Sequence, residues 1–304
     1  MSAPFDKSWA FEKHYFHHSN PNRPLCVVLY EKCIIRPLVD WAWKVKKGES
    51  SGDKNTAQAI IKKYESHAAK MLGGTLAEDC AKSVLIEDHT YEAALRHGMS
   101  LLDAYKPRDW DDGKDERQLI VVRDEFADVL KNTIAGVTEA HEVYGLNRIT
   151  GQSEILANLA GLELPYSGFP DFSRRIELKT KWSTAAATKS GKRSASLPST
   201  PDWNHVQQVA GYWAGTGLMQ AIVYANAKEY RVFTEDNCDL LTHEGLQSVL
   251  NHMVAKLAIR ENLLKSCDSI EQMLRLIEPD FKHFYAWDKR PEVVNDAKKL
   301  WGFK

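Results

Sequence analysis

Residues 168–181, GFPDFSRRIELKTK, carry the pattern that decides the fold prediction. Side chains alternate between the two faces of a β-strand. Ile176 and Leu178 therefore point to one face, where they can pack on an apolar core. Glu177 and Lys179 point to the other face. The stretch predicts a half-buried strand that presents a carboxylate beside an ammonium group.

The residues before this strand predict a hairpin. If residues 173–175 form its loop, Phe172 pairs with Ile176 and Asp171 lies opposite Glu177. Two neighbouring carboxylates repel each other, and a divalent cation between them relieves that repulsion. No histidine or cysteine set accompanies them, so the pattern favours Mg²⁺ or Mn²⁺. The plain alternative is a surface hairpin with an exposed Glu–Lys pair.

A metal site of this kind suits phosphodiester hydrolysis. The metal lowers the pKa of a bound water and neutralises charge on the scissile phosphate. Lys179 is placed to orient that water or to stabilise the charge that develops in the transition state.

The segment after residue 200 predicts a helix over about 201–214. Thr200, Pro201 and Asp202 read as its N-cap, first residue and acidic first turn, and the glycines of 215–217 read as its end. Within this helix, His205, Gln208 and Tyr212 stand at positions i, i+3 and i+7 and share one face. The alternative is a half-buried amphipathic helix with a polar edge.

The rest of the chain predicts helices on both sides of a small group of strands. Helical periodicity falls near 26–46, 55–71, 75–86, 90–104, 115–144, 240–264, 268–278 and 291–301. Strand-like runs fall within 153–182 and at Met219–Ala225 and Tyr230–Thr234, and residues 1–25 read as loop. We expect an α/β protein: residues 1–150 form a helical region around a core at 151–236, and helices of 237–304 pack on the same domain.

The composition fits a globular chain and excludes several kinds of site. The 304 residues are 43% hydrophobic and 27% charged, with a net charge of −1. The five cysteines include no Cys-x-x-Cys pair, which argues against a cysteine zinc site or an iron–sulfur cluster and fits a reducing cytoplasm. We find no apolar run long enough to span a bilayer and no signal-peptide pattern. These features predict a cytoplasmic protein without membrane contact.

Basic residues concentrate around the predicted site. Residues 172–204 hold seven basic residues and two acidic ones, so this region has a net charge of +5 in a chain whose total is −1. Local positive charge of this kind fits binding to a phosphate backbone. The polar segment 183–200 within it predicts a mobile surface loop. The predicted DNA-binding residues are Arg174, Lys181, Lys189, Lys192, Arg193 and His205.

Three motifs in this order resemble the PD-(D/E)XK nuclease superfamily, in particular its RecB-like branch with the λ-type and phage recombination exonucleases. They are GFPD at 168–171, IELK at 176–179 and QVAGY at 208–212, and the similar region covers about residues 150–235. The resemblance implies a restriction-endonuclease-like mixed β-sheet core flanked by helices, with a large N-terminal helical region. It also implies metal binding by Asp171, Glu177 and the Leu178 carbonyl, and catalysis by Lys179 with support from Gln208 and Tyr212.

The same branch places a further acidic or histidine ligand on an upstream helix. Gly74-Thr75-Leu76-Ala77-Glu78 resembles that pattern, with Thr75 as a helix cap and Glu78 as the ligand. Glu139, His141, Glu142 and Glu154 are alternatives closer to Asp171 in the sequence.

The resemblance implies a Mg²⁺- or Mn²⁺-dependent DNA exonuclease of a phage or bacterium, acting in DNA recombination, repair or degradation. Its partners would be single- or double-stranded DNA without sequence preference and a single-strand annealing or binding protein, in the host cytoplasm if the chain is phage-encoded. Two alternatives remain: an endonuclease of the restriction or junction-resolving type with the same fold, and a non-catalytic DNA-binding protein. The oligomeric state is left open.

Overall fold

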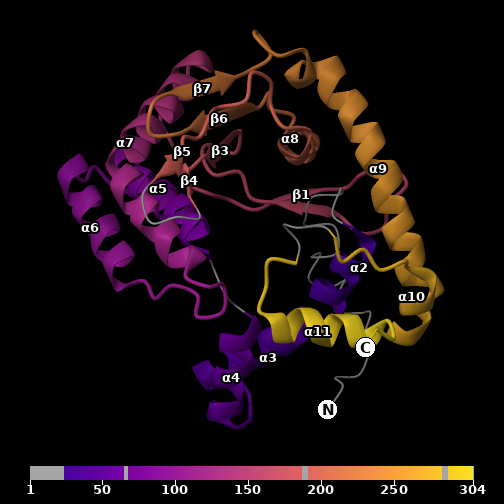
Figure 1. Cartoon of the computed structure of the whole chain (residues 1–304). Coiled ribbons are helices and arrows are strands. Elements are labelled where there is room, and N and C mark those ends of the chain that lie inside the picture. The colour runs from indigo at the N-terminus through magenta and orange to yellow at the C-terminus, as the bar shows by residue number, and fades with distance from the viewer. Residues whose placement is uncertain (1–23, 65–67, 187–190, 283–286, 304) are drawn as a thin grey trace. The chain divides into compact units, whose positions relative to one another are not determined.

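The computed structural model describes residues 24–64, 68–186, 191–282 and 287–303 (Figure 1). The chain divides into two compact units. One comprises Met1–Ser66, Asn158–Ser167 and Met253–Lys304, and the other comprises His67–Ala157 and Gly168–His252. These units differ from the ranges 1–150, 151–236 and 237–304 predicted from the sequence. Helices before residue 150 pack directly against the strands that follow it, so both belong to the second unit. All predicted site residues fall in the second unit.

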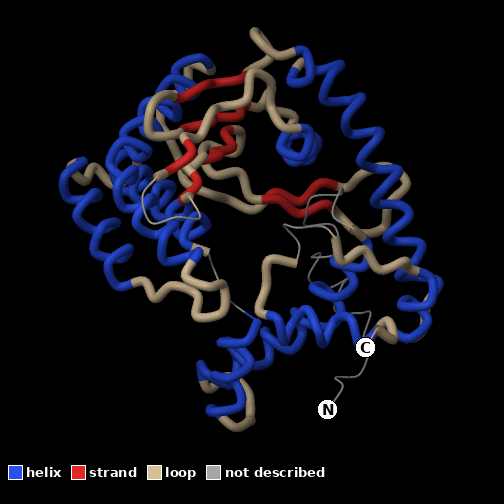
Figure 2. The backbone as a smooth tube through the Cα atoms, viewed as in Figure 1, coloured by secondary structure: helices blue, strands red, loops and turns tan. Residues whose placement is uncertain are grey.

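The second unit is built on a mixed three-stranded sheet. Its strands are β3 (Ile176–Thr180), β6 (Ala221–Ala225) and β7 (Tyr230–Phe233), in the order β3-β6-β7. β3 is parallel to β6, and β6 is antiparallel to β7. Helix α8 (Trp203–Thr216) lies in the crossover from β3 to β6. These strands and this helix confirm the predicted order of elements, and the unit is α/β (Figure 2).

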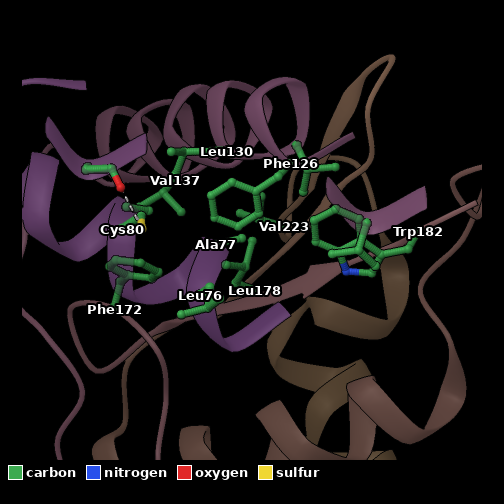
Figure 3. Close-up of a cluster of buried hydrophobic side chains, with 14 of the residues drawn as sticks. Leu76, Ala77, Cys80, Phe126, Leu130, Val137, Phe172, Leu178, Trp182 and Val223 are labelled. Carbon is green, nitrogen blue, oxygen red and sulfur yellow. Dashed lines mark hydrogen bonds between the residues drawn. The ribbon is translucent and has the colours of Figure 1, made fainter. Parts of the chain in front are cut away.

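Helices α5 (Ala69–Leu85), α6 (Tyr91–Ala104) and α7 (Lys114–Val143) form the helical layer of this unit. Ile176, Leu178 and Val223 contribute the apolar face of the sheet to a core shared with α5 and α7. Figure 3 shows Leu178 and Val223 beside side chains of these two helices. The face with Ile176 and Leu178 is therefore covered, as the alternation predicts, and Glu177 faces α8 on the other side.

Glycine allows the close approach of α7 to the sheet. A Cβ added at Gly136 of α7 would lie 2.7 Å from Cγ1 of Val223 on β6. A real side chain at this position would push the helix away from the strand. The close packing of α7 on the Val223 side chain of β6 therefore depends on the glycine at position 136.

The described elements of the first unit are mainly helices. This unit contains α2 (Leu25–Val28), the π-helix η1 (Leu29–Ile35), α3 (Arg36–Lys47), α4 (Lys54–Tyr64), α10 (Ile270–Leu276) and α11 (Pro291–Leu300). Further elements are β1 (Ile155–Ala157), β2 (Tyr166–Gly168), β4 (Thr184–Ala185), β5 (Lys192–Arg193), η2 (Asp239–Leu241) and α9 (His243–Ser266). In the part of the chain that is described, no helix is long and apolar enough to cross a membrane.

Three local predictions were wrong. Helix α5 begins at Ala69, so Thr75 lies inside the helix and caps nothing. Helix α8 begins at Trp203 with Asp202 as its N-cap, so Thr200 and Pro201 precede it. The segment 183–200 is not simply a loop, because β4 and β5 pair as antiparallel strands and form the β4–β5 hairpin; residues 187–190 lie outside the described residues. In the third case, hydrogen bonds from the Ser183 and Ala185 backbone to α7 hold the segment in place.

Candidate active site

The predicted hairpin before β3 is present with the predicted register. Phe172 and Ile176 form an antiparallel bridge, in which each backbone N–H donates to the carbonyl of the other at 3.0 and 2.9 Å. Ser173 and Arg174 form the turn with φ angles of 51° and 60°. Left-handed conformation at both central residues belongs to the tight turn that suits the twist of a hairpin. The turn brings Asp171 back alongside β3.

The two carboxylates of the hairpin are buried. Asp171 is 7% exposed and Glu177 is 2% exposed. Asp171 Oδ2 accepts a 2.8 Å hydrogen bond from the backbone N–H of Leu178. This bond fixes the Asp171 side chain against the strand that carries Glu177. The exposed Glu–Lys pair considered above is therefore ruled out.

Glu177 has one satisfied and one unsatisfied oxygen. Its Oε1 accepts a 2.7 Å hydrogen bond from Nε2 of Gln208 and forms an ion pair with Lys179. Its Oε2 is buried and has no hydrogen-bond partner among the described residues. A buried carboxylate oxygen without a donor is costly in a folded protein. Such an oxygen is available to a ligand.

The carboxylates at this site repel one another, and the ammonium group of Lys179 offsets part of that repulsion. Burial raises the pKa of Asp171 well above its usual value, and the nearby carboxylates of Glu177 and Glu78 raise it further. Burial also raises the pKa of Glu177, although Lys179 and a hydrogen bond with Tyr212 act in the opposite direction. Burial would lower the pKa of Lys179, but the three carboxylates outweigh it and leave this pKa raised. Lys179 therefore keeps its proton at neutral pH.

Helix α8 supplies the polar residues that support Glu177. Gln208 Nε2 also lies within hydrogen-bond distance of the Tyr212 hydroxyl, at 2.5 Å. The Tyr212 hydroxyl donates to the carbonyl of Phe169 at 3.3 Å. The predicted face of Gln208 and Tyr212 thus meets Glu177 and the chain just before Asp171.

Among the candidates for the upstream carboxylate, Glu78 is the one that acts on the site. Its charge contributes to the pKa shifts of Asp171, Glu177 and Lys179. It also forms an ion pair with Lys82 one turn along α5. Glu139, His141, Glu142 and Glu154 are not among the main causes of those shifts. The long sequence separation from Asp171 is closed by the packing of α5 on β3.

The donor set of this site fits a hard divalent cation. It consists of carboxylate oxygens, one of them without a donor, in a buried place where like charges repel. Within the described ranges, no group of three or more His, Cys, Asp or Glu side chains is already arranged to hold a metal ion. The fit therefore rests on Asp171 and Glu177, with Leu178 directly after Glu177 on β3 and Glu78 nearby.

The predicted DNA-binding residues lie in different surroundings. Arg174 and Arg193 are exposed. Lys181 forms a 3.1 Å ion pair with Asp202, and Lys192 forms a 2.8 Å ion pair with the buried Glu125. His205 is half-buried. Lys189 lies outside the described residues.

Sequence reasoning missed the residues that anchor the β4–β5 hairpin. Glu125 of α7 accepts a 3.0 Å hydrogen bond from the backbone N–H of Ser183. Gln118, two turns earlier, donates to the Ser183 carbonyl at 2.8 Å and accepts from the Ala185 N–H at 3.1 Å. Both anchors stand about sixty residues upstream, where no local pattern distinguishes them from ordinary helix residues.

Comparison with known proteins gives no match. No protein-family model, no curated protein and no solved structure is similar to this chain. The function must therefore be inferred from the chemistry of the site.

Proposed function

We propose that this protein is a Mg²⁺- or Mn²⁺-dependent deoxyribonuclease with Asp171, Glu177 and Lys179 at its catalytic centre. The observation that carries the proposal is the buried Glu177 carboxylate, with one oxygen lacking a donor, beside a second buried carboxylate and a charged lysine. Buried ionisable groups with shifted pKa values cluster at functional sites. Motif order adds support, because the helix with Gln208 and Tyr212 follows the hairpin.

The fold of the second unit supports the same proposal. We infer a restriction-endonuclease-like core, in which a mixed sheet carries the acidic hairpin and helices cover both faces. Support comes from β3, which holds Glu177 and Lys179, and from α8, which lies in the crossover to the parallel neighbour of β3.

Three groups of this chain would hold the ion: the carboxylates of Asp171 and Glu177 and the backbone carbonyl of Leu178. Glu78 would add negative charge from α5. When bound, the ion would lower the pKa of a coordinated water and neutralise phosphate charge.

Lys179 would act as a fixed positive charge beside the reacting phosphate. Its raised pKa keeps it an ammonium at neutral pH, so it can donate hydrogen bonds to a phosphate oxygen or to the attacking water. Its pairing with Glu177 holds it in place before the substrate binds. Preorganised charge of this kind stabilises a transition state without the cost of rearrangement.

Gln208 and Tyr212 would keep the Glu177 carboxylate in one orientation. Gln208 donates to Glu177 Oε1, and Tyr212 connects Gln208 to the Phe169 carbonyl. With Oε1 held, Oε2 is the oxygen left for the ion. Arg174, Lys181 and Arg193 would bind the phosphate backbone without reading bases.

Calorimetric titration of the protein with Mn²⁺ in the absence of DNA tests the metal site. We expect saturable binding that is lost in Glu177→Gln and strongly weakened in Asp171→Asn. Glu139→Gln serves as the matched control, because Glu139 is bonded to Tyr230 on another part of the unit. Equal Mn²⁺ binding by the wild type and Glu177→Gln would rule out this site.

We favour an exonuclease over an endonuclease on the resemblance alone. Incubating the protein and Mg²⁺ with linear DNA and with covalently closed circular DNA separates the two. We expect degradation of the linear form and an intact circle. Cutting of the closed circle would identify an endonuclease instead.

A further inference from the structure

His205 makes a hydrogen bond that determines where its proton lies. Its Nδ1 is 2.6 Å from the hydroxyl oxygen of Tyr224. Tyr224 lies on β6, fully buried, and is the register partner of Lys179 on β3. The histidine is one turn before Gln208 on α8, on the face that meets Glu177. This contact places an imidazole next to the proposed catalytic centre.

The hydrogen-bond pattern favours the phenol of Tyr224 as the donor in this bond. Its oxygen already accepts a 3.0 Å hydrogen bond from the backbone N–H of Asp202. The phenolic proton therefore needs an acceptor, and among the described residues the one within reach is Nδ1 of His205. An imidazole that accepts at Nδ1 carries its proton on Nε2.

The charged groups around His205 agree with an uncharged ring. Burial and the positive charges of Lys179 and Lys181 lower the pKa of His205 to about 4, against the opposing effect of Asp202. Asp202 Oδ2 is 3.6 Å from Nδ1, beyond hydrogen-bond distance, and pairs with Lys181 at 3.1 Å. At neutral pH, His205 is therefore a neutral ring whose Nε2 carries the proton.

We propose that His205 donates its Nε2–H to a phosphate oxygen of the bound DNA strand, and that Tyr224 is the positioning residue that fixes this tautomer. The inference rests on the proposed nuclease function. A phosphate near Lys179 is the anion that such a donor fits. His205 does not act as a general base, because Nδ1 is occupied and Nε2 already carries a proton. Since the ring is neutral, its contact releases no counterion.

Nuclear magnetic resonance of the ring nitrogens tests the tautomer directly. We expect a two-bond ¹H–¹⁵N spectrum at pH 7 to show His205 protonated on Nε2, with its signals assigned by their loss in His205→Gln. Tyr224→Phe should abolish this single tautomer and give a mixture. A wild-type His205 protonated on Nδ1, or on both nitrogens, would overturn the proposal.

Two substitutions of His205 test the contact with DNA. His205→Gln keeps an N–H donor near the Nε2 position, whereas the shorter His205→Asn does not reach it. We expect His205→Asn to bind a short DNA duplex about tenfold more weakly in the absence of divalent metal, as for the loss of one hydrogen bond. His205→Gln should recover most of the affinity. Equal affinity of the wild type and His205→Asn would contradict the proposal.

The salt dependence separates this contact from an ionic one. We expect the slope of log affinity against log salt to be the same for the wild type and His205→Asn, because no charge is removed. A smaller slope for His205→Asn would show a charged imidazole and overturn the proposal. Failure of the wild type to cleave DNA would refute the nuclease function while the spectra and binding data still test His205.

Discussion

Asp171, a proposed metal ligand, illustrates what a buried carboxyl costs the fold. Its carboxyl is buried near two other carboxylates, and its pKa is higher in the folded protein than in the unfolded chain. The stability gained from the protonated form is complete below the unfolded pKa and is lost as pH rises through the folded pKa. At neutral pH without metal, ionisation of this group therefore favours unfolding.

We expect Asp171→Asn to unfold at a higher temperature than the wild type at pH 7.5 in a chelator. The gain should be about 0.5–2 kcal/mol, typical of replacing a strained functional group. It should shrink as pH falls, because the wild-type carboxyl then becomes neutral. The asparagine oxygen can still accept from the Leu178 N–H. Thermal melts at several pH values measure this difference.

Asp115 is the matched control for this prediction. It is also a buried aspartate, but it accepts hydrogen bonds from the Ala69 N–H, the Tyr105 hydroxyl and the Arg108 N–H. We expect Asp115→Asn to lower the melting temperature, because the amide group cannot accept all three bonds. A stabilising effect of both substitutions, or of neither, would contradict the distinction between a functional and a structural carboxylate.

At the scale of elements, the β4–β5 hairpin depends on α7. Glu125 links the Ser183 backbone to Lys192 on β5. We expect Glu125→Gln to speed hydrogen exchange at the backbone amides of Ser183, Ala185 and Ala186 while the sheet stays protected. Glu229→Gln removes an exposed pairing with Arg231 and should leave these amides unchanged. Unchanged exchange in Glu125→Gln would show that the hairpin is held by other contacts.

Gly136 provides a second prediction for α7. Alanine favours a helix by about 1 kcal/mol over glycine, but its Cβ would meet Val223 on β6 at 2.7 Å. Overpacking of this kind costs about 1–3 kcal/mol. We expect Gly136→Ala to lower the free energy of unfolding in a denaturant titration. A more stable variant would mean that α7 shifts freely against the sheet.

The elements best predicted from the sequence are those with a strong periodic pattern. The strand at 176–180 followed from alternating apolar and charged residues, and the register of its hairpin followed from the three-residue loop. The start of α5 was misplaced at Thr75, whereas the helix begins at Ala69 and passes through Gly73 and Gly74 against the core. The β4–β5 hairpin has no apolar alternation, so its anchors on α7 were not visible in the sequence.

The same difference between local patterns and contacts over long sequence distances applies to the site residues. Asp171 and Glu177 could be paired from the sequence because a short turn joins them. The proposal of Glu78 as a ligand depended on resemblance, since its distance from Asp171 in the chain is closed by helix packing that no local pattern describes. The link from Tyr224 to His205 joins a strand to a helix, and sequence reasoning gave no signal for it.

At the scale of the whole molecule, the proposed binding to DNA can be tested through the distribution of charge. The chain has a net charge of −1, whereas residues 172–204 alone have a net charge of +5. We expect DNA affinity to fall with salt with a log–log slope of about −3, as for three or four phosphate contacts. Lys181→Met should reduce the slope by about 0.9, and Lys131→Met on the exposed side of α7 should not. A slope near zero would argue against backbone binding.

The most direct test of the central claim is single-turnover cleavage of linear DNA by the wild type and by Lys179→Met, with Mn²⁺ present. We predict metal-dependent cleavage by the wild type, abolished by a chelator, and a rate at least about 100-fold lower for Lys179→Met. Lys131→Met serves as the control and should cleave at the wild-type rate. Cleavage by Lys179→Met at the wild-type rate, or no cleavage by the wild type with Mg²⁺ or Mn²⁺, would contradict the account.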